Sequence, residues 1–156
     1  MPIVDFYLNE ASNPDGLMIQ DIWAMSDEEL EFNHDVVQWL FPSIQDSRFN
    51  PDAPILTDDE IQLFHSNPRL QETLRTSYHR MMTFFGLHFE DGAVTQVEKK
   101  PVWDSFNHNW LRITRILKSL TILGLTTEAV ALLTWIEAQE TLSSDSMNYW
   151  WRAVRK

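Results

Sequence analysis

The chain has 156 residues, with 12 Lys and Arg residues against 23 Asp and Glu residues, and it contains no cysteine. This length corresponds to one domain, and the lack of cysteine excludes a disulfide framework, a thiolate zinc site and a cysteine nucleophile. The formal net charge of −11 opposes binding to a polyanion, so we do not expect nucleic-acid binding. Residues 1–66 carry this imbalance, because they hold 14 acidic residues and one basic residue, Arg48.

The ends and the apolar stretches of the chain bear on its location. The first ten residues lack the basic and apolar regions of a secretory signal. Apolar stretches stay far below the ~20 residues that a membrane span requires. We therefore expect no membrane span and a reducing, cytoplasmic setting.

The first clear helix signal is a capping box, in which Ser26 and Glu29 satisfy the free amides of a helix start. The apolar pattern continues from there to Leu40, and Pro42 ends the helix because its ring and missing N–H cannot continue it. A second capping box begins a helix at Thr57.

Four further helices are predicted after these two. Asn67 and Pro68 begin one helix, in which apolar residues recur every three or four positions until Gly86 ends it. A long helix with the same periodicity is expected from Trp103 to Gly124. Thr126 or Thr127 begins the next helix, and Ser143 or Ser144 begins a last one.

These signals predict an all-α single domain over residues 1–156, with six to seven helices. Residues 87–98 contain a turn flanked by short apolar segments, which leaves open one short hairpin there. Most of the seven tryptophans lie beside other apolar residues and are expected in the core. Trp150 and Trp151 are neighbours that cannot share one helix face, so one of them is a candidate contact surface.

Polar residues gather on one face of two predicted helices. The first face holds Glu31, His34, Asp35 and Gln38, and the second holds His108, Arg112, Arg115 and Ser119. An arginine presents a planar donor fork that suits a carboxylate or a phosphate. The two faces are either ordinary solvated surfaces or parts of a site for an anionic ligand.

Motifs for catalysis or for a cofactor are weak in this sequence. Glu31 and His34 have the spacing of a di-iron ligand pair, but no second pair of this kind exists, so no metal is expected. We also find no phosphate-binding glycine loop and no Gly-x-Ser-x-Gly motif, so no cofactor is expected.

Two long motifs carry a resemblance to a known family. Residues 34–42 read HDVVQWLFP and residues 108–120 read HNWLRITRILKSL. In this order they are similar to the HD-x-x-QWLFP and HN-x-LRITRILKSL motifs of the opioid growth factor receptor conserved region. The resemblance implies an all-α domain. In animal members it implies binding of the pentapeptide Met-enkephalin and restraint of cell proliferation from the nucleus or the nuclear envelope.

The chain matches only the conserved core of that family, which suggests a stand-alone domain from a microbial relative. Seven polar residues match motif positions and are the candidate ligand-binding residues: His34, Asp35, Gln38, His108, Asn109, Arg112 and Arg115.

The leading hypothesis is a non-catalytic binding module with a polar groove between the two motif helices, which recognises a peptide or a small anionic ligand. One alternative is a structural or protein-interaction domain in which these residues form an internal network. Another is a small-molecule enzyme that uses His34 and His108 as acid and base.

Overall fold

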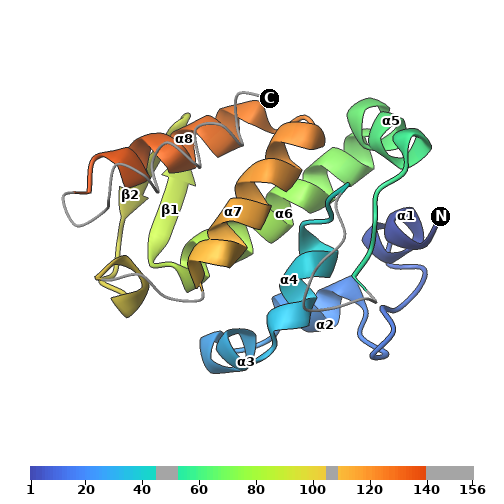
Figure 1. Cartoon of the computed structure of the whole chain (residues 1–156), viewed down its shortest axis with the longest axis horizontal. Helices are drawn as coiled ribbons and strands as arrows, with labels where there is room; N and C mark the ends of the chain where they lie inside the picture. Colours follow the sequence, from blue (N-terminus) through green and yellow to red (C-terminus); the bar gives the residue numbers. More distant parts are fainter. Residues whose placement is uncertain (45–52, 105–108, 140–156) are drawn as a thin grey trace. The chain divides into compact units, whose positions relative to one another are not determined.

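The computed structural model of the chain describes residues 1–44, 53–104 and 109–139. Its contacts divide the chain into two compact units, Met1–Ser77 and Tyr78–Lys156, and each unit is described by itself. The described residues form eight α-helices, a short 3-10 helix and a two-stranded sheet (Figure 1). The fold is therefore mostly helical, as predicted, and the hairpin that the sequence left open is present. A single domain over residues 1–156 stays a prediction.

Unit 1 contains five short helices and the first part of a longer one. Aromatic residues of the first helix form its core: Phe6 packs edge-on against Trp39 at 5.2 Å and Tyr7 against Phe64 at 5.0 Å between ring centroids. The hydroxyl of Tyr7 donates to the carbonyl of Leu40, and burial raises the pKa of Tyr7. The helices are α1 (Pro2–Tyr7), α2 (Ile19–Trp23), α3 (Asp27–Phe32), α4 (His34–Leu40), α5 (Asp58–Ser66) and α6 (Pro68–Phe84).

The predicted helix from Ser26 to Leu40 is two helices, which corrects the sequence interpretation. Asn33 lies between α3 and α4 with a ψ of 79°, which no α-helix accommodates. Its side-chain amide donates to the carbonyl of Glu29 at 2.7 Å, so it ends α3 and begins α4. Phe32, which lies within the apolar pattern of the predicted helix, is 75% exposed.

The three caps that the sequence predicted in unit 1 are confirmed. Ser26 accepts the amide of Glu29 at 3.1 Å, and Thr57 accepts that of Glu60 at 3.2 Å. The side-chain oxygen of Asn67 accepts the amide of Arg69 at 2.9 Å, directly before α6. These local signals were readable because each cap depends on residues within one turn of the chain.

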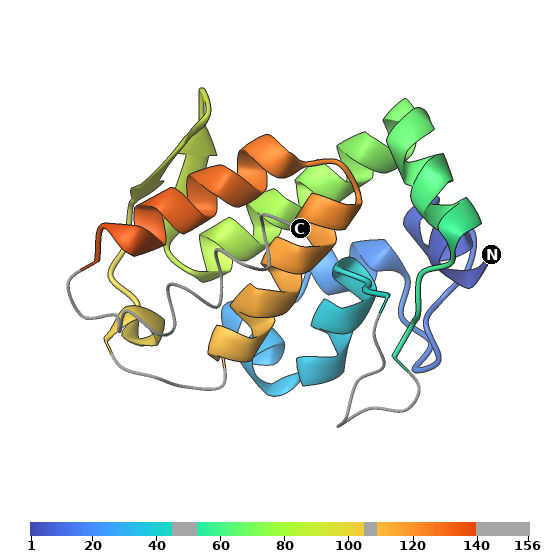
Figure 2. The ribbon, with the colours of Figure 1, turned by 45° about the horizontal axis from the view of Figure 1, so that its top comes forward.

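Unit 2 contains the rest of α6, the hairpin and two helices (Figure 2). The indole of Trp103 donates to the carbonyl of Phe85 at 2.9 Å and packs against Trp135 at 4.8 Å between ring centroids. The hydroxyl of Tyr78 donates to the carbonyl of Glu128 at 3.0 Å. The elements are β1 (Leu87–Glu90), β2 (Ala93–Gln96), the 3-10 helix η1 (Pro101–Trp103), α7 (Asn109–Ile122) and α8 (Thr126–Glu137).

The long helix begins later than predicted. Trp103 belongs to η1, and the described part of the helix begins at Asn109. The start of α8 at Thr126 is confirmed, although its N-cap is Leu125 without a side-chain cap. The predicted helix start at Ser143 or Ser144 and the Trp150–Trp151 pair lie outside the described residues.

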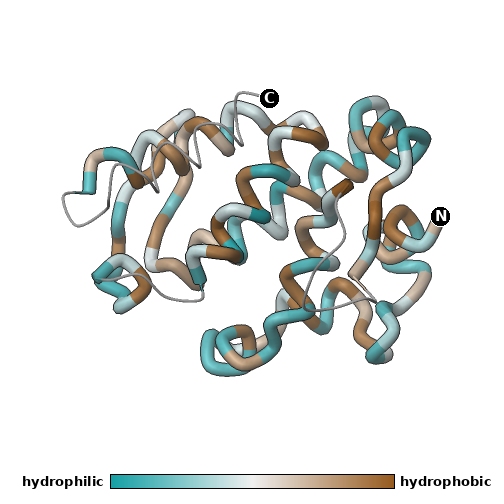
Figure 3. Tube along the Cα trace, viewed as in Figure 1, coloured by the Kyte–Doolittle hydropathy of each residue, from teal (hydrophilic) through white to brown (hydrophobic). Residues whose placement is uncertain are grey.

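Hydrophobic and hydrophilic residues alternate along α7 (Figure 3). In the part of the chain that the structure describes, no helix combines the length and the apolar character that a membrane crossing demands.

Candidate functional site

The first motif places three candidate residues on α4. His34 and Asp35 form the start of this helix and are exposed, and Gln38 is half-buried one turn later. Val36, Val37, Trp39 and Leu40 are buried on the same helix. The short helix therefore keeps its apolar side in unit 1 and presents the two motif residues at its start to solvent.

Glu31 and His34, which have the sequence spacing of a di-iron ligand pair, lie on two different helices in the structure. Because Asn33 separates α3 from α4, these two residues do not project from one regular helix turn. Across residues 1–44, 53–104 and 109–139, no group of three His, Cys, Asp or Glu side chains could hold a metal ion.

The second motif places its polar residues on a helix that is buried on most sides. Asn109 and Arg112 are each only 5% exposed. Arg112 donates to the side-chain oxygen of Asn109 at 3.0 Å, and its guanidinium carbon lies 5.8 Å from the ring centroid of Phe84. The guanidinium is thus positioned by a hydrogen bond and a cation–π contact, and this part of the polar face is not a solvated surface.

Arg115 lies one turn after Arg112 and is half-buried. Burial lowers the pKa of Arg115 to about 10, because removing water disfavours the charged guanidinium. Residues three apart on a helix are neighbours on its surface, so α7 brings two guanidiniums to one face. His108 lies outside the described residues, and Ser119 is fully buried.

The two motif helices belong to different units, α4 to Met1–Ser77 and α7 to Tyr78–Lys156. The structure therefore brings Asn109, Arg112 and Arg115 together within unit 2, and it places His34, Asp35 and Gln38 together within unit 1.

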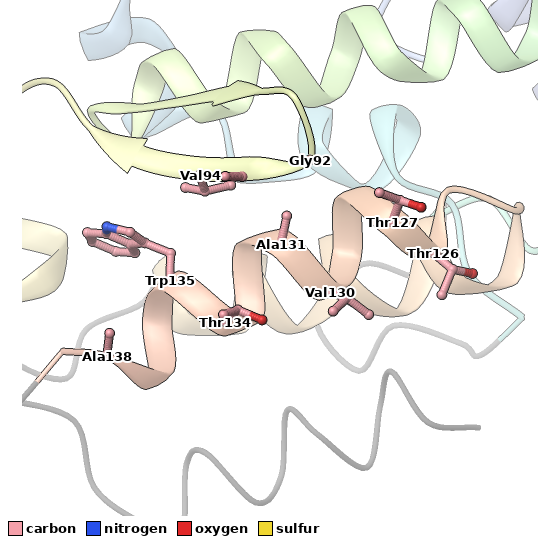
Figure 4. Close-up of a pocket in the computed structure, with 10 residues that line it drawn as sticks. Gly92, Val94, Thr126, Thr127, Val130, Ala131, Thr134, Trp135 and Ala138 are labelled. Atoms are coloured by element: carbon pink, nitrogen blue, oxygen red, sulfur yellow. The ribbon is translucent and has the colours of Figure 1, made fainter.

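Sequence reasoning missed a groove in unit 2 (Figure 4). It has a volume of about 600 Å³ and lies between the hairpin and α8. Gly92, Ala93 and Val94 line it from the hairpin. The α8 side is lined by Thr126, Thr127, Val130, Ala131, Thr134, Trp135 and Ala138.

The α8 side of the groove could be found in the sequence from the spacing of its uncharged residues. Positions 127, 130, 131, 134, 135 and 138 follow a helical stripe, and none of them is charged. Thr127, Thr134 and Ala138 are exposed, and Val130 is 37% exposed. A stripe of uncharged side chains, several of which stay at the surface, differs from a solvated charged face, and it marks a candidate contact site.

Comparison with known proteins identifies a family that matches this chain. The model of a family described as opioid growth factor receptor (OGFr) conserved region matches residues 1–156. The chain is 41% identical over 133 residues to the opioid growth factor receptor of Rattus norvegicus, which covers 78% of this chain and 23% of that protein. No solved structure gives a significant match.

Two further relatives match this chain with similar identity and coverage. The opioid growth factor receptor of Homo sapiens is 39% identical over 137 residues, which is 80% of this chain and 20% of that protein. The opioid growth factor receptor-like protein 1 of Xenopus tropicalis is 38% identical over 129 residues, which is 76% of this chain and 25% of that protein. The chain spans about a fifth to a quarter of the length of these relatives.

Proposed function

Since the chain belongs to the opioid growth factor receptor conserved-region family, we propose that it is a non-catalytic binding domain for a peptide or a small anionic ligand. The names of the mammalian relatives describe receptors for a growth factor, which supports a ligand-binding role. The matched region covers most of this chain, so a binding role within that region extends to these residues.

The observation that carries the proposal is the pair of guanidiniums on α7. Arg112 is held in place by Asn109 and Phe84, and Arg115 lies next to it with part of its side chain at the surface. A guanidinium with little surrounding water binds a carboxylate more strongly than an exposed one, because the effective dielectric constant is lower. In this proposal Arg115 contacts the carboxylate of the ligand, and Arg112 and Asn109 position that face of the helix.

The exposed residues of the other motif are proposed as additional ligand contacts. His34 and Asp35 are accessible at the start of α4, and Gln38 is partly accessible. Substituting an exposed residue rarely changes the free energy of unfolding by more than ~0.5 kcal/mol. A loss of ligand affinity in His34→Ala or Asp35→Ala would therefore report a direct contact.

The burial of α7 also supports a structural role for its polar residues. Asn109 and Arg112 share a hydrogen bond in a buried place, as expected of an internal network. The two roles differ at Arg115, because a half-buried residue contributes less to stability than a buried pair.

The test is isothermal titration of the full chain with Met-enkephalin and with its C-terminal amide, which lacks the carboxylate. We expect the wild type to bind the free acid and Arg115→Ala to bind it about tenfold more weakly, the loss of roughly one charge-assisted hydrogen bond. Lys118→Ala is the matched control, because Lys118 is a half-buried base on the same helix. Equal affinity of the wild type and Arg115→Ala would refute the site, and no binding of either peptide would refute the function.

The pH dependence gives a second check. Arg115 carries its charge below its pKa of about 10 and loses it as the pH rises through that value. Affinity for the carboxylate should therefore stay constant from pH 7 to 9 and fall above pH 10.

A further inference from the structure

The groove between the hairpin and α8 borders a strand edge whose hydrogen-bonding groups can be derived from the register. β1 and β2 are antiparallel, with Glu90 opposite Ala93, Phe89 opposite Val94 and Leu87 opposite Gln96. Asp91 and Gly92 form the two-residue turn, and both have positive φ, 53° and 79°. This is the type I′ geometry of a tight hairpin.

In such a hairpin every second residue pair exchanges hydrogen bonds, beginning with the pair that closes the turn. The amide of Val97 donates to the carbonyl of Gly86 at 2.8 Å, which fits this alternation. The N–H and C=O groups of Ala93 and Thr95 therefore point toward β1. Those of Val94 and Gln96 point away from it, toward the free edge of β2.

This free edge lies beside α8. The groove is lined by residues of β2 and its turn and by none of β1 in the described parts of the chain. In Figure 4, β2 lies between β1 and α8. Within these described parts, the backbone groups of Val94 and Gln96 have no hydrogen-bonding partner.

The surface of α8 next to this edge has the properties of a floor for another strand. Ala131 is buried, whereas Thr127, Val130 and Thr134 remain at the surface, and none of the described residues that line the groove is charged. The lining from Thr127 to Ala138 covers about 16 Å of helix axis at ~1.5 Å per residue. An extended chain rises ~3.3 Å per residue, so about five extended residues match this length.

We propose that this groove binds an extended peptide of about five residues, which adds as a strand to the free edge of β2. The peptide backbone pairs with the N–H and C=O groups of Val94 and Gln96. Alternate side chains lie on the surface formed by Thr127, Val130 and Thr134, so uncharged side chains of small or medium size are preferred at those positions. This proposal rests on the proposed peptide-binding function and gives it a second contact surface within unit 2.

The experiment uses the capped peptide acetyl-Thr-Val-Thr-Val-Thr-amide and the ¹⁵N-labelled full chain, followed by NMR. The peptide has no charge, so it does not use the carboxylate site at Arg115. We expect millimolar binding, with shifts concentrated at the amides of Val94, Gln96, Thr127 and Val130. The shifts should follow one binding curve.

Two protein variants isolate the backbone contact. Gln96 is exposed, so Gln96→Ala removes its side chain and keeps the N–H, whereas Gln96→Pro also removes the N–H that points to the free edge. We expect Gln96→Pro to bind at least tenfold more weakly than Gln96→Ala. Equal binding by the two variants would overturn the proposal.

Two modified peptides test the same contact without changing the protein. One modified peptide carries methyl groups on the backbone nitrogens of its two valines. The other carries them on the backbone nitrogens of its second and third threonines. Each peptide lacks one set of alternate N–H groups. A peptide that pairs as a strand loses binding in one of these two forms and keeps it in the other. Equal loss, equal retention or no binding of the parent peptide would overturn the proposal.

Other occupants of the edge give distinct results. Shifts of Val94 and Gln96 that depend on protein concentration without peptide would show pairing with a second copy and overturn the proposal. Hydrogen-exchange protection of the Gln96 amide in the monomer without peptide would show that the chain itself covers the edge, with the same consequence. If the capped peptide binds here and Met-enkephalin does not bind anywhere, the groove stands and the proposed carboxylate site at Arg115 fails.

Discussion

The substitution Gly86→Ala tests how the hairpin is joined to α6. Gly86 has a φ of +74°, and a Cβ atom built on it lies 2.2 Å from the carbonyl oxygen of Glu98. The neighbouring atom belongs to the backbone, so a side-chain rotation cannot relieve the contact. The carbonyl of Gly86 also accepts the amides of Val97 and Glu98 at 2.8 and 3.1 Å, and these bonds hold the end of the hairpin against the end of the helix.

The expected cost follows from these two effects. A left-handed conformation costs an L residue about 1 kcal/mol or more. Moving Glu98 away weakens the two hydrogen bonds at Gly86, each worth about 1 kcal/mol. We therefore expect Gly86→Ala to lower the free energy of unfolding by about 3–4 kcal/mol, which is at the upper end for a single substitution.

Gly92→Ala is the matched control in the same hairpin. Gly92 has a similar φ of +79°, but no atom lies within 4 Å of its built Cβ. Its substitution carries the conformational cost alone, about 1 kcal/mol. Urea unfolding followed by tryptophan fluorescence measures both variants. A loss in Gly86→Ala that matches the loss in Gly92→Ala within about 0.5 kcal/mol, of the order of ordinary surface effects, would refute the steric argument.

Three further outcomes are expected. Tyr78→Phe removes the hydrogen bond from the Tyr78 hydroxyl to the buried carbonyl of Glu128, which also accepts an amide within α8, and should lower stability by about 1 kcal/mol in urea unfolding. Burial raises the pKa of Tyr78 above its ordinary value of 10. The contribution of the neutral Tyr78 side chain to stability is therefore complete below pH 10 and is lost as the pH rises further. Absorbance at 295 nm should show the ionisation of Tyr78 only as the chain unfolds. Arg112→Ala leaves Asn109 buried without this donor and should lower the melting temperature clearly, whereas His34→Ala, at an exposed position, should leave it within 2 °C, and equal shifts would contradict the burial argument.

Much of the helical architecture was readable from short stretches of sequence. The capping boxes at Ser26 and Thr57 and the Asn67–Pro68 start are confirmed, because a cap is a contact between residues three or fewer positions apart. The interruption at Asn33 was missed, since asparagine is tolerated inside an amphipathic pattern and its non-helical ψ has no periodicity signal.

The candidate site was only partly readable. The motifs identified Asn109, Arg112 and Arg115 by residue type and spacing, but spacing on one helix cannot report what packs over its polar face. The structure shows that Arg112 is buried against Phe84, a residue 28 positions earlier in the chain. The groove beside β2 was missed for the same reason, because its two walls are distant in sequence.

The sequence by itself determined the helical character, the helix starts, the acidic first half and the family motifs, because each depends on local patterns or on composition. Only the tertiary structure decided which polar residues are buried, where the strand edge is free and which surface of α8 remains uncovered. These properties depend on contacts between segments far apart in the chain. The acidic character of residues 1–66 is therefore a property of composition alone, whereas the proposed binding surfaces depend on how the chain packs.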